Sequence, residues 1–96
     1  MTKPFKYSNQ TYRDDVIAAA LISREKEIFH YEFDIENFTY ILNNTADLGM
    51  KKDMEKRISD THRQLAIAQG TYNALEAQII DQAAHQAALV RVRSSK

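Results

Sequence analysis

Apolar residues recur at alternating spacings of four and three positions along two long stretches of the 96-residue chain. The first stretch carries Ile17, Leu21, Arg24, Ile28, Tyr31, Ile35, Phe38 and Leu42, and the second carries Met54, Ile58, Thr61, Leu65, Ala68, Tyr72, Leu75 and Ile79. This heptad spacing is typical of helices that pack side by side as a coiled coil. Because the chain has only two glycines and one proline to interrupt helices, the sequence predicts an all-α fold.

Between the two stretches, residues 43–49 are of types that favour turns and helix caps. We therefore predict a helix over residues 11–43, a turn over residues 43–49 and a second helix over residues 50–93. An extended amino-terminal arm over residues 1–10 precedes the helices, and a tail over residues 94–96 follows them. Thr11 and Asp14 resemble a capping box at the start of the first helix.

A short connection makes consecutive helices antiparallel neighbours, so the two predicted helices form a long, coiled-coil-like hairpin. The charges support this register, because the acidic second half of the first helix would face the basic first half of the second. With the turn centred near residue 46, the predicted partners at one level are Asp34 with Arg57, Glu32 with His62, and Glu25 with Gln69.

Two apolar faces would remain uncovered on a single hairpin: the outer face of the first helix and the alanine-rich end of the second, which extends past the first. The predicted interaction surface comprises Ile22, Phe29, Phe33, Tyr40, Ile80, Ala84 and Ala88. Either the amino-terminal arm folds back with Phe5 and Tyr7, or another protomer supplies the cover. We expect a homo-oligomer, a dimer or higher, in which hairpins associate into a four-helix or larger bundle.

Polar residues interrupt the predicted seams at Arg24, Gln82 and Gln86. Such residues often set the register and the partner specificity of coiled coils. For Arg24, the simpler interpretation is that its stem packs along the helix while its guanidinium group reaches Glu27 or Gln69.

The spacing Glu27-x-x-His30 is used by carboxylate-bridged di-iron bundles, and His62 lies at the level of His30 across the hairpin. We therefore consider Glu27, His30 and His62 as candidate metal ligands. The simpler interpretation is an ordinary solvated surface, since the spacing occurs only once and a di-iron site needs further carboxylates. Asp81 and His85 are interpreted as a helical ion pair rather than a cation site. The sequence has no nucleophile elbow, phosphate-binding loop or paired-carboxylate motif, so we predict no enzymatic activity, no catalytic residue and no cofactor.

The composition narrows the range of partners. The 13 basic and 13 acidic residues balance, whereas nucleic-acid-binding proteins usually carry a basic excess, so nucleic acid is not the expected partner. The absence of cysteine excludes disulfides and thiolate metal sites. The sequence has no long apolar run and no signal-peptide pattern, so we expect no membrane partner and a cytoplasmic protein.

In its overall pattern of residues, the chain resembles the small two-helix accessory proteins of tailed bacteriophages. The segments that carry the resemblance are REKEIFHYEFDIENFTYIL, residues 24–42, and MEKRISDTHRQLAIAQGTYNALEAQI, residues 54–79. The resemblance gives no residue a catalytic or binding role. It implies a role in virion assembly or toward a host protein, in the host cytoplasm. We therefore expect a non-enzymatic interaction or assembly protein. The alternatives are a phage-encoded inhibitor or modulator of a host protein and a carboxylate/His metal-binding helical bundle.

Overall fold

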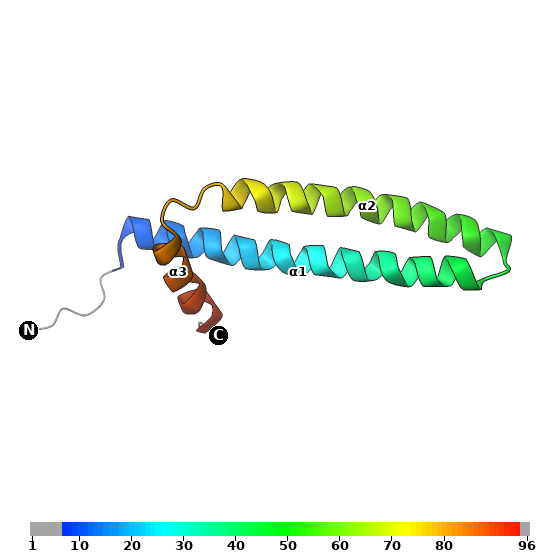
Figure 1. Ribbon diagram of the computed structural model, residues 1–96, viewed down its shortest axis with the longest axis horizontal. Helices are drawn as coiled ribbons and strands as arrows, with labels where there is room; N and C mark the ends of the chain where they lie inside the picture. The colour runs from blue at the N-terminus through cyan, green and yellow to red at the C-terminus, as the bar shows by residue number, and fades with distance from the viewer. Residues whose placement is uncertain (1–6, 95–96) are drawn as a thin grey trace, which may run out of the picture.

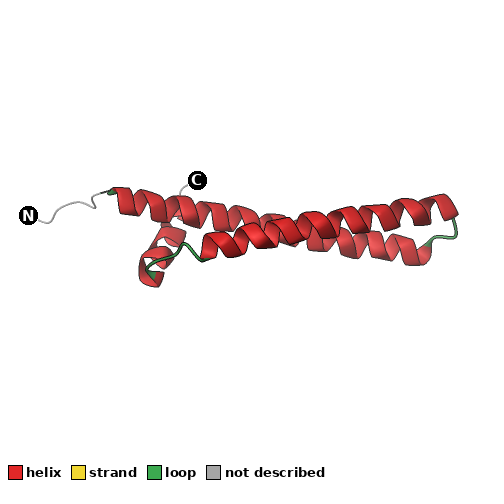
Figure 2. Ribbon diagram, turned by 90° about the horizontal axis from the view of Figure 1, so that it is seen from above, coloured by secondary structure: helices red, strands yellow, loops and turns green. Residues whose placement is uncertain are grey.

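The computed structural model describes residues 7–94, which form three α-helices: α1 (Asn9–Asn44), α2 (Leu48–Glu76) and α3 (Gln82–Ser94). Helices α1 and α2 lie side by side in opposite directions, and α3 crosses α1 near its start (Figure 1). The view from above shows the same arrangement (Figure 2), and the molecule measures 73 × 24 × 16 Å. The all-α prediction is confirmed. Most of the predicted arm and the last two residues of the predicted tail lie outside the described residues.

Helix α1 begins earlier than the sequence predicts. Ser8 is its N-cap, and the Ser8 hydroxyl oxygen accepts a hydrogen bond from the Thr11 backbone N–H at 3.1 Å. The predicted capping box at Thr11 is therefore wrong. Serine caps a helix at least as well as threonine, and capping at Ser8 adds most of a turn to the helix.

The loop between α1 and α2 covers residues 45–47, inside the predicted turn region. Asp47 is the N-cap of α2, and its Oδ1 accepts hydrogen bonds from the backbone N–H groups of Gly49 at 2.8 Å and Met50 at 3.3 Å. The Thr45 hydroxyl accepts the Asp47 backbone N–H at 3.2 Å. These bonds satisfy backbone donors that the start of a helix otherwise leaves unpaired.

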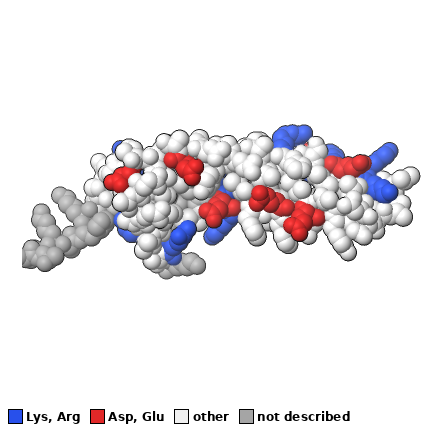
Figure 3. All heavy atoms as spheres, viewed as in Figure 1, with Lys and Arg blue, Asp and Glu red and all other residues white. Residues whose placement is uncertain are grey.

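Helices α1 and α2 pack along their heptad seams, since every residue of the two predicted seams is buried or half-buried. The three predicted cross-helix polar pairs, by contrast, are not formed in the described residues. Arg57 bonds to Asp53 on its own helix at 3.0 Å, and its guanidinium group lies 6.0 Å from the centre of the Phe38 ring on α1. Side chains three or four positions apart on one helix are already neighbours, so exposed charges pair along the helix. Figure 3 shows acidic groups along the middle of one face and basic groups near the α1–α2 loop.

The prediction of a single second helix that continues to residue 93 is wrong. Helix α2 passes through Gly70 but ends at Glu76, and α3 begins at Gln82. A continuous helix would carry residues 82–94 past the start of α1 and leave their apolar side chains in water. Folding back buries Ala88 completely and Leu89 and Val92 in part. Removing this apolar surface from water stabilises the folded-back arrangement at about 25 cal/mol per Å².

Helix α3 packs against α1 and not against α2. Its N-cap is Asp81, whose Oδ1 accepts hydrogen bonds from the backbone N–H groups of Ala83 at 2.9 Å and Ala84 at 3.2 Å. The predicted ion pair between Asp81 and His85 is replaced by this cap, and His85 is buried. In the part of the chain that the structure describes, no helix combines the length and apolarity that spanning a membrane requires.

Gly70 offers a test of the α2 packing. It is exposed in the last two turns of α2, and a Cβ atom added there would meet nothing within 4 Å. We expect Gly70→Ala to raise the free energy of unfolding by about 1 kcal/mol, because alanine loses less backbone entropy in a helix. Urea unfolding followed by circular dichroism measures this change.

Gly49→Ala is the matched control, since its Cβ would lie 3.2 Å from the Asp47 Oδ1 atom that caps α2. We expect a smaller gain or a loss at this position. A destabilising effect of Gly70→Ala would contradict an uncovered helical position at residue 70.

Candidate functional site

Three aromatic side chains form an exposed stripe on the outer face of α1. Phe29 is 69% exposed, Phe33 is 53% exposed and Tyr40 is 69% exposed. They recur at helical spacing and point away from the seam that packs on α2. We call Phe29, Phe33 and Tyr40 the aromatic stripe. Large aromatic side chains are rarely grouped in this way on the surface of a monomer without a partner, so the stripe is the leading candidate for an interaction surface.

The other members of the predicted interaction surface are treated differently by the fold. Ile22, which precedes the stripe on the same face of α1, is half-buried, as is Ala84 on α3. Ala88 has no exposed surface within the single chain, so the prediction that it is an uncovered surface residue is wrong. Ile80 lies between α2 and α3 and is 81% exposed. The folded-back α3 therefore covers Ala88 fully and Ala84 in part, while Ala83, Ala87 and Val90 of the same helix stay exposed.

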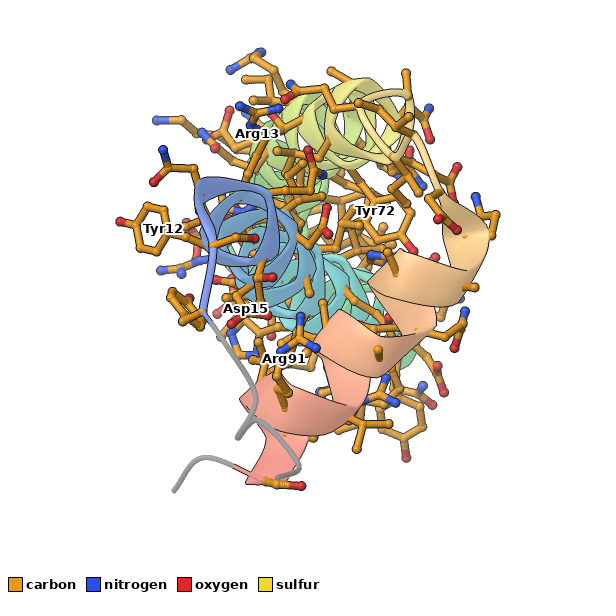
Figure 4. The ribbon with its side chains drawn as sticks, turned by 90° about the vertical axis from the view of Figure 1, so that its left-hand side faces the viewer. Tyr12, Arg13, Asp15, Tyr72 and Arg91 are labelled. Atoms are coloured by element: carbon orange, nitrogen blue, oxygen red, sulfur yellow. The ribbon has the colours of Figure 1, made fainter. Side chains whose placement is uncertain are left out.

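An ion pair joins α3 to the start of α1. Arg91 donates from Nε to Oδ1 of Asp15 at 2.9 Å, and its second guanidinium nitrogen lies 2.8 Å from the same oxygen. The other carboxylate oxygen accepts the Tyr7 hydroxyl at 3.0 Å. Figure 4 shows Asp15 and Arg91 pointing toward each other between the two helices. Both carboxylate oxygens are engaged, so the pair fixes where α3 sits on α1.

The same contacts shift the protonation of two groups. The hydrogen bond from Arg91 lowers the pKa of Asp15 below its ordinary value, and the bond from Tyr7 acts in the same direction. Partial desolvation of the Tyr7 hydroxyl raises the pKa of Tyr7, and the neighbouring Asp15 carboxylate adds to this effect. Asp15 therefore stays ionised in the folded protein to a lower pH than in the unfolded chain.

A shallow hollow lies beside this ion pair. Its volume is about 380 Å³, and it opens to solvent between Asp15, Val16 and Ala19 of α1 and Arg91 and Val92 of α3. A second open hollow borders it through Val16 and is lined by Asn9, Tyr12 and Arg13. The two charged groups of the first hollow are bonded to each other, which leaves little polar chemistry directed at a ligand.

The predicted register and metal candidates lie apart from one another. Arg24 pairs with Glu27 at 3.2 Å, which is one of the two contacts that the simpler interpretation of Arg24 predicts. His30 lies 3.4 Å from Asp34. In the described residues, no group of three His, Asp or Glu side chains is placed to hold a metal ion. Gln82 and Gln86 are exposed on α3. Since α3 is not a continuation of α2, neither glutamine interrupts the α1–α2 seam, and that part of the prediction is wrong.

Comparisons of the chain with protein-family models, with curated proteins and with solved structures give no match.

The ion pair predicts an acid-sensitive docking of α3. The pKa of Asp15 is lowered in the folded state, so its contribution to stability is complete above its ordinary value of 3.8 and is lost as the pH falls through the lowered value. We expect the amide signals of α3 in NMR spectra to shift toward an undocked helix over this acidic range, below pH 3.8.

Asp15→Asn is the control, because the amide cannot titrate. In this variant α3 docks more weakly at neutral pH, and the component of the acid transition that belongs to Asp15 disappears. An acid transition of α3 that is the same in Asp15→Asn and the wild type would contradict the assignment.

Proposed function

We propose that this chain is a non-enzymatic interaction protein that self-associates through the aromatic stripe of α1. The observation that carries the proposal is the exposure of Phe29, Phe33 and Tyr40 together on one helix face. Each aromatic side chain offers on the order of 150–250 Å² of largely apolar surface, of which more than half is in water here. Pairing of two stripes would remove several such side chains from solvent at about 25 cal/mol per Å².

The geometry of α1 suits association of whole α1–α2 units. The stripe and the α2-facing seam lie on different faces of α1, so α1 can pack on α2 and on a second α1 at the same time. Two units joined through their stripes would form a four-helix assembly in which the two α1 helices pack on each other and each α2 lies on the outside.

The remaining features favour binding over catalysis. The hollows at the start of α1 are open, and the charged groups in the larger one are engaged with each other. The metal candidates Glu27 and His30 already pair with Arg24 and Asp34. A metal-binding bundle would require these pairs to break and further carboxylates to converge, so it ranks below self-association.

Docking on a virion or host protein, which the phage resemblance implies, is the alternative use of the same stripe. A second exposed apolar site at the α1–α2 loop, formed by Leu48 and Met50, would suit an inhibitor that inserts its tip. Met54, the other methionine near the tip, is buried and cannot contribute to that contact.

Substitution of Phe29 tests the proposal. We expect wild-type protein to have a mass in light scattering that rises with concentration to at least that of a dimer. Phe29→Glu places a charge within the paired stripes, and we expect the dimer dissociation constant to rise by at least tenfold, about 1.4 kcal/mol. The helical content should not change, because Phe29 is exposed in the single chain.

Ile67→Glu is the matched control, because Ile67 is 59% exposed on α2 and lies outside the stripe. We expect this variant to associate like the wild type. A wild-type protein that stays monomeric, or a Phe29→Glu variant that associates normally, would overturn self-association through the stripe. Loss of a captured virion or host protein in Phe29→Glu, with no change in mass, would favour the alternative.

A further inference from the structure

The segment between α2 and α3 bends without any residue that requires a bend. Residues 77–81 are Ala, Gln, Ile, Ile and Asp, with neither glycine nor proline. In the described residues no φ angle is positive, and Ala77 itself keeps helical angles of −65° and −16°. The backbone N–H groups of Gln78 and Ile79 bond to the carbonyls three residues earlier at 3.0 and 3.1 Å. Asp81 caps α3, but nothing else in the segment requires a bend, so the bend depends largely on what α3 touches.

Helix α3 docks on a site that is formed by α1 alone. Its contacts with other helices are with α1 alone, and Ala18 of α1 and Ala88 of α3 are both fully buried. Asp15 and Arg91 close the contact, with side chains that are 19% and 31% exposed. An isolated helix of 13 residues is marginal in water, so α3 depends on this site for its stability.

Every copy of the chain carries the same docking site and the same α3. Another copy's α3 can thus make the contacts that α3 makes here, at no loss of buried surface. If the segment over residues 77–81 becomes helical, α3 extends beyond the start of its own α1, where a second molecule can reach it. Short connecting segments between a body and a detachable element are the usual setting for exchange of that element.

We propose that α3 exchanges between two copies of this chain, so that α3 of each molecule docks on α1 of the other and Arg91 pairs with the partner's Asp15. The closed and the exchanged forms share the same docking contacts, and concentration sets the balance between them. The exchange uses the start of α1 and leaves the aromatic stripe uncovered. It is therefore independent of the self-association proposed above.

Two single charge reversals test the exchange. In Asp15→Arg the closed form opposes two arginines, and in Arg91→Asp it opposes two aspartates, so each variant alone destabilises its own docking. In an exchanged heterodimer both contacts become Arg–Asp pairs again. All proteins carry Phe29→Glu, so that association through the stripe does not contribute. We expect the equimolar mixture, and neither variant alone, to show a species of twice the 11.1 kDa chain mass in native mass spectrometry.

Two controls separate exchange from other effects. Arg93→Asp has the same net charge as Arg91→Asp but changes an exposed residue of α3, so its mixture with Asp15→Arg should give no heterodimer. The double variant Asp15→Arg/Arg91→Asp restores the pair within one chain and should show wild-type helical content and the same dimer fraction as the unreversed protein. A mixture of the two single variants that contains only monomers would overturn the exchange, as would an equal amount of heterodimer with Arg93→Asp.

Discussion

The shape of this protein depends on apolar burial at the start of α1. Ile17, Ala18 and Leu21 are buried there, where α2 and α3 both pack on α1. Elsewhere along the seam α1 has only α2 beside it, and most seam residues are half-buried. Two helices side by side leave most of the side chains between them partly in water, with Met54 near the α1–α2 loop an exception, so a third helix is needed to build a larger core. Helix α3 provides it at this end, with Ala88 against α1 and the Asp15–Arg91 pair at the edge of the contact.

The features that the sequence predicts well are those that depend on neighbours within one or two turns. The alternating spacing of four and three predicts the buried faces of α1 and α2, because the period of a helix fixes which residues share a face. The loop is also predicted correctly within residues 43–49, because its residues act locally: the Asp47 side chain caps the helix that directly follows it. The exposure of Phe29, Phe33 and Tyr40 also follows from the helical period.

The break after Glu76 could not be predicted in this way, because it arises from contacts between residues far apart in the chain. Residues 77–81 contain no glycine or proline, and their one local signal is Asp81, which caps α3, so the burial gained on α1 is what makes the bend favourable. The Asp15–Arg91 pair spans 76 positions. In the sequence, Asp15 is an ordinary acidic residue of a first helical turn, and Arg91 belongs to a basic end. Their pairing has no periodic or motif signal that points to it.

The length of α3 explains why one apolar face of α1 is covered and another is not. With 13 residues, α3 is about 20 Å long, whereas α1 with 36 residues is about 54 Å long. Helix α3 also crosses α1 instead of running along it (Figure 1), so it can cover only the start of the outer face. Ile22 falls near the limit of this cover and is half-buried, while Phe29, Phe33 and Tyr40 lie beyond it. Helix α3 thus covers the start of the outer face of α1 within one chain, whereas the aromatic stripe stays exposed to solvent.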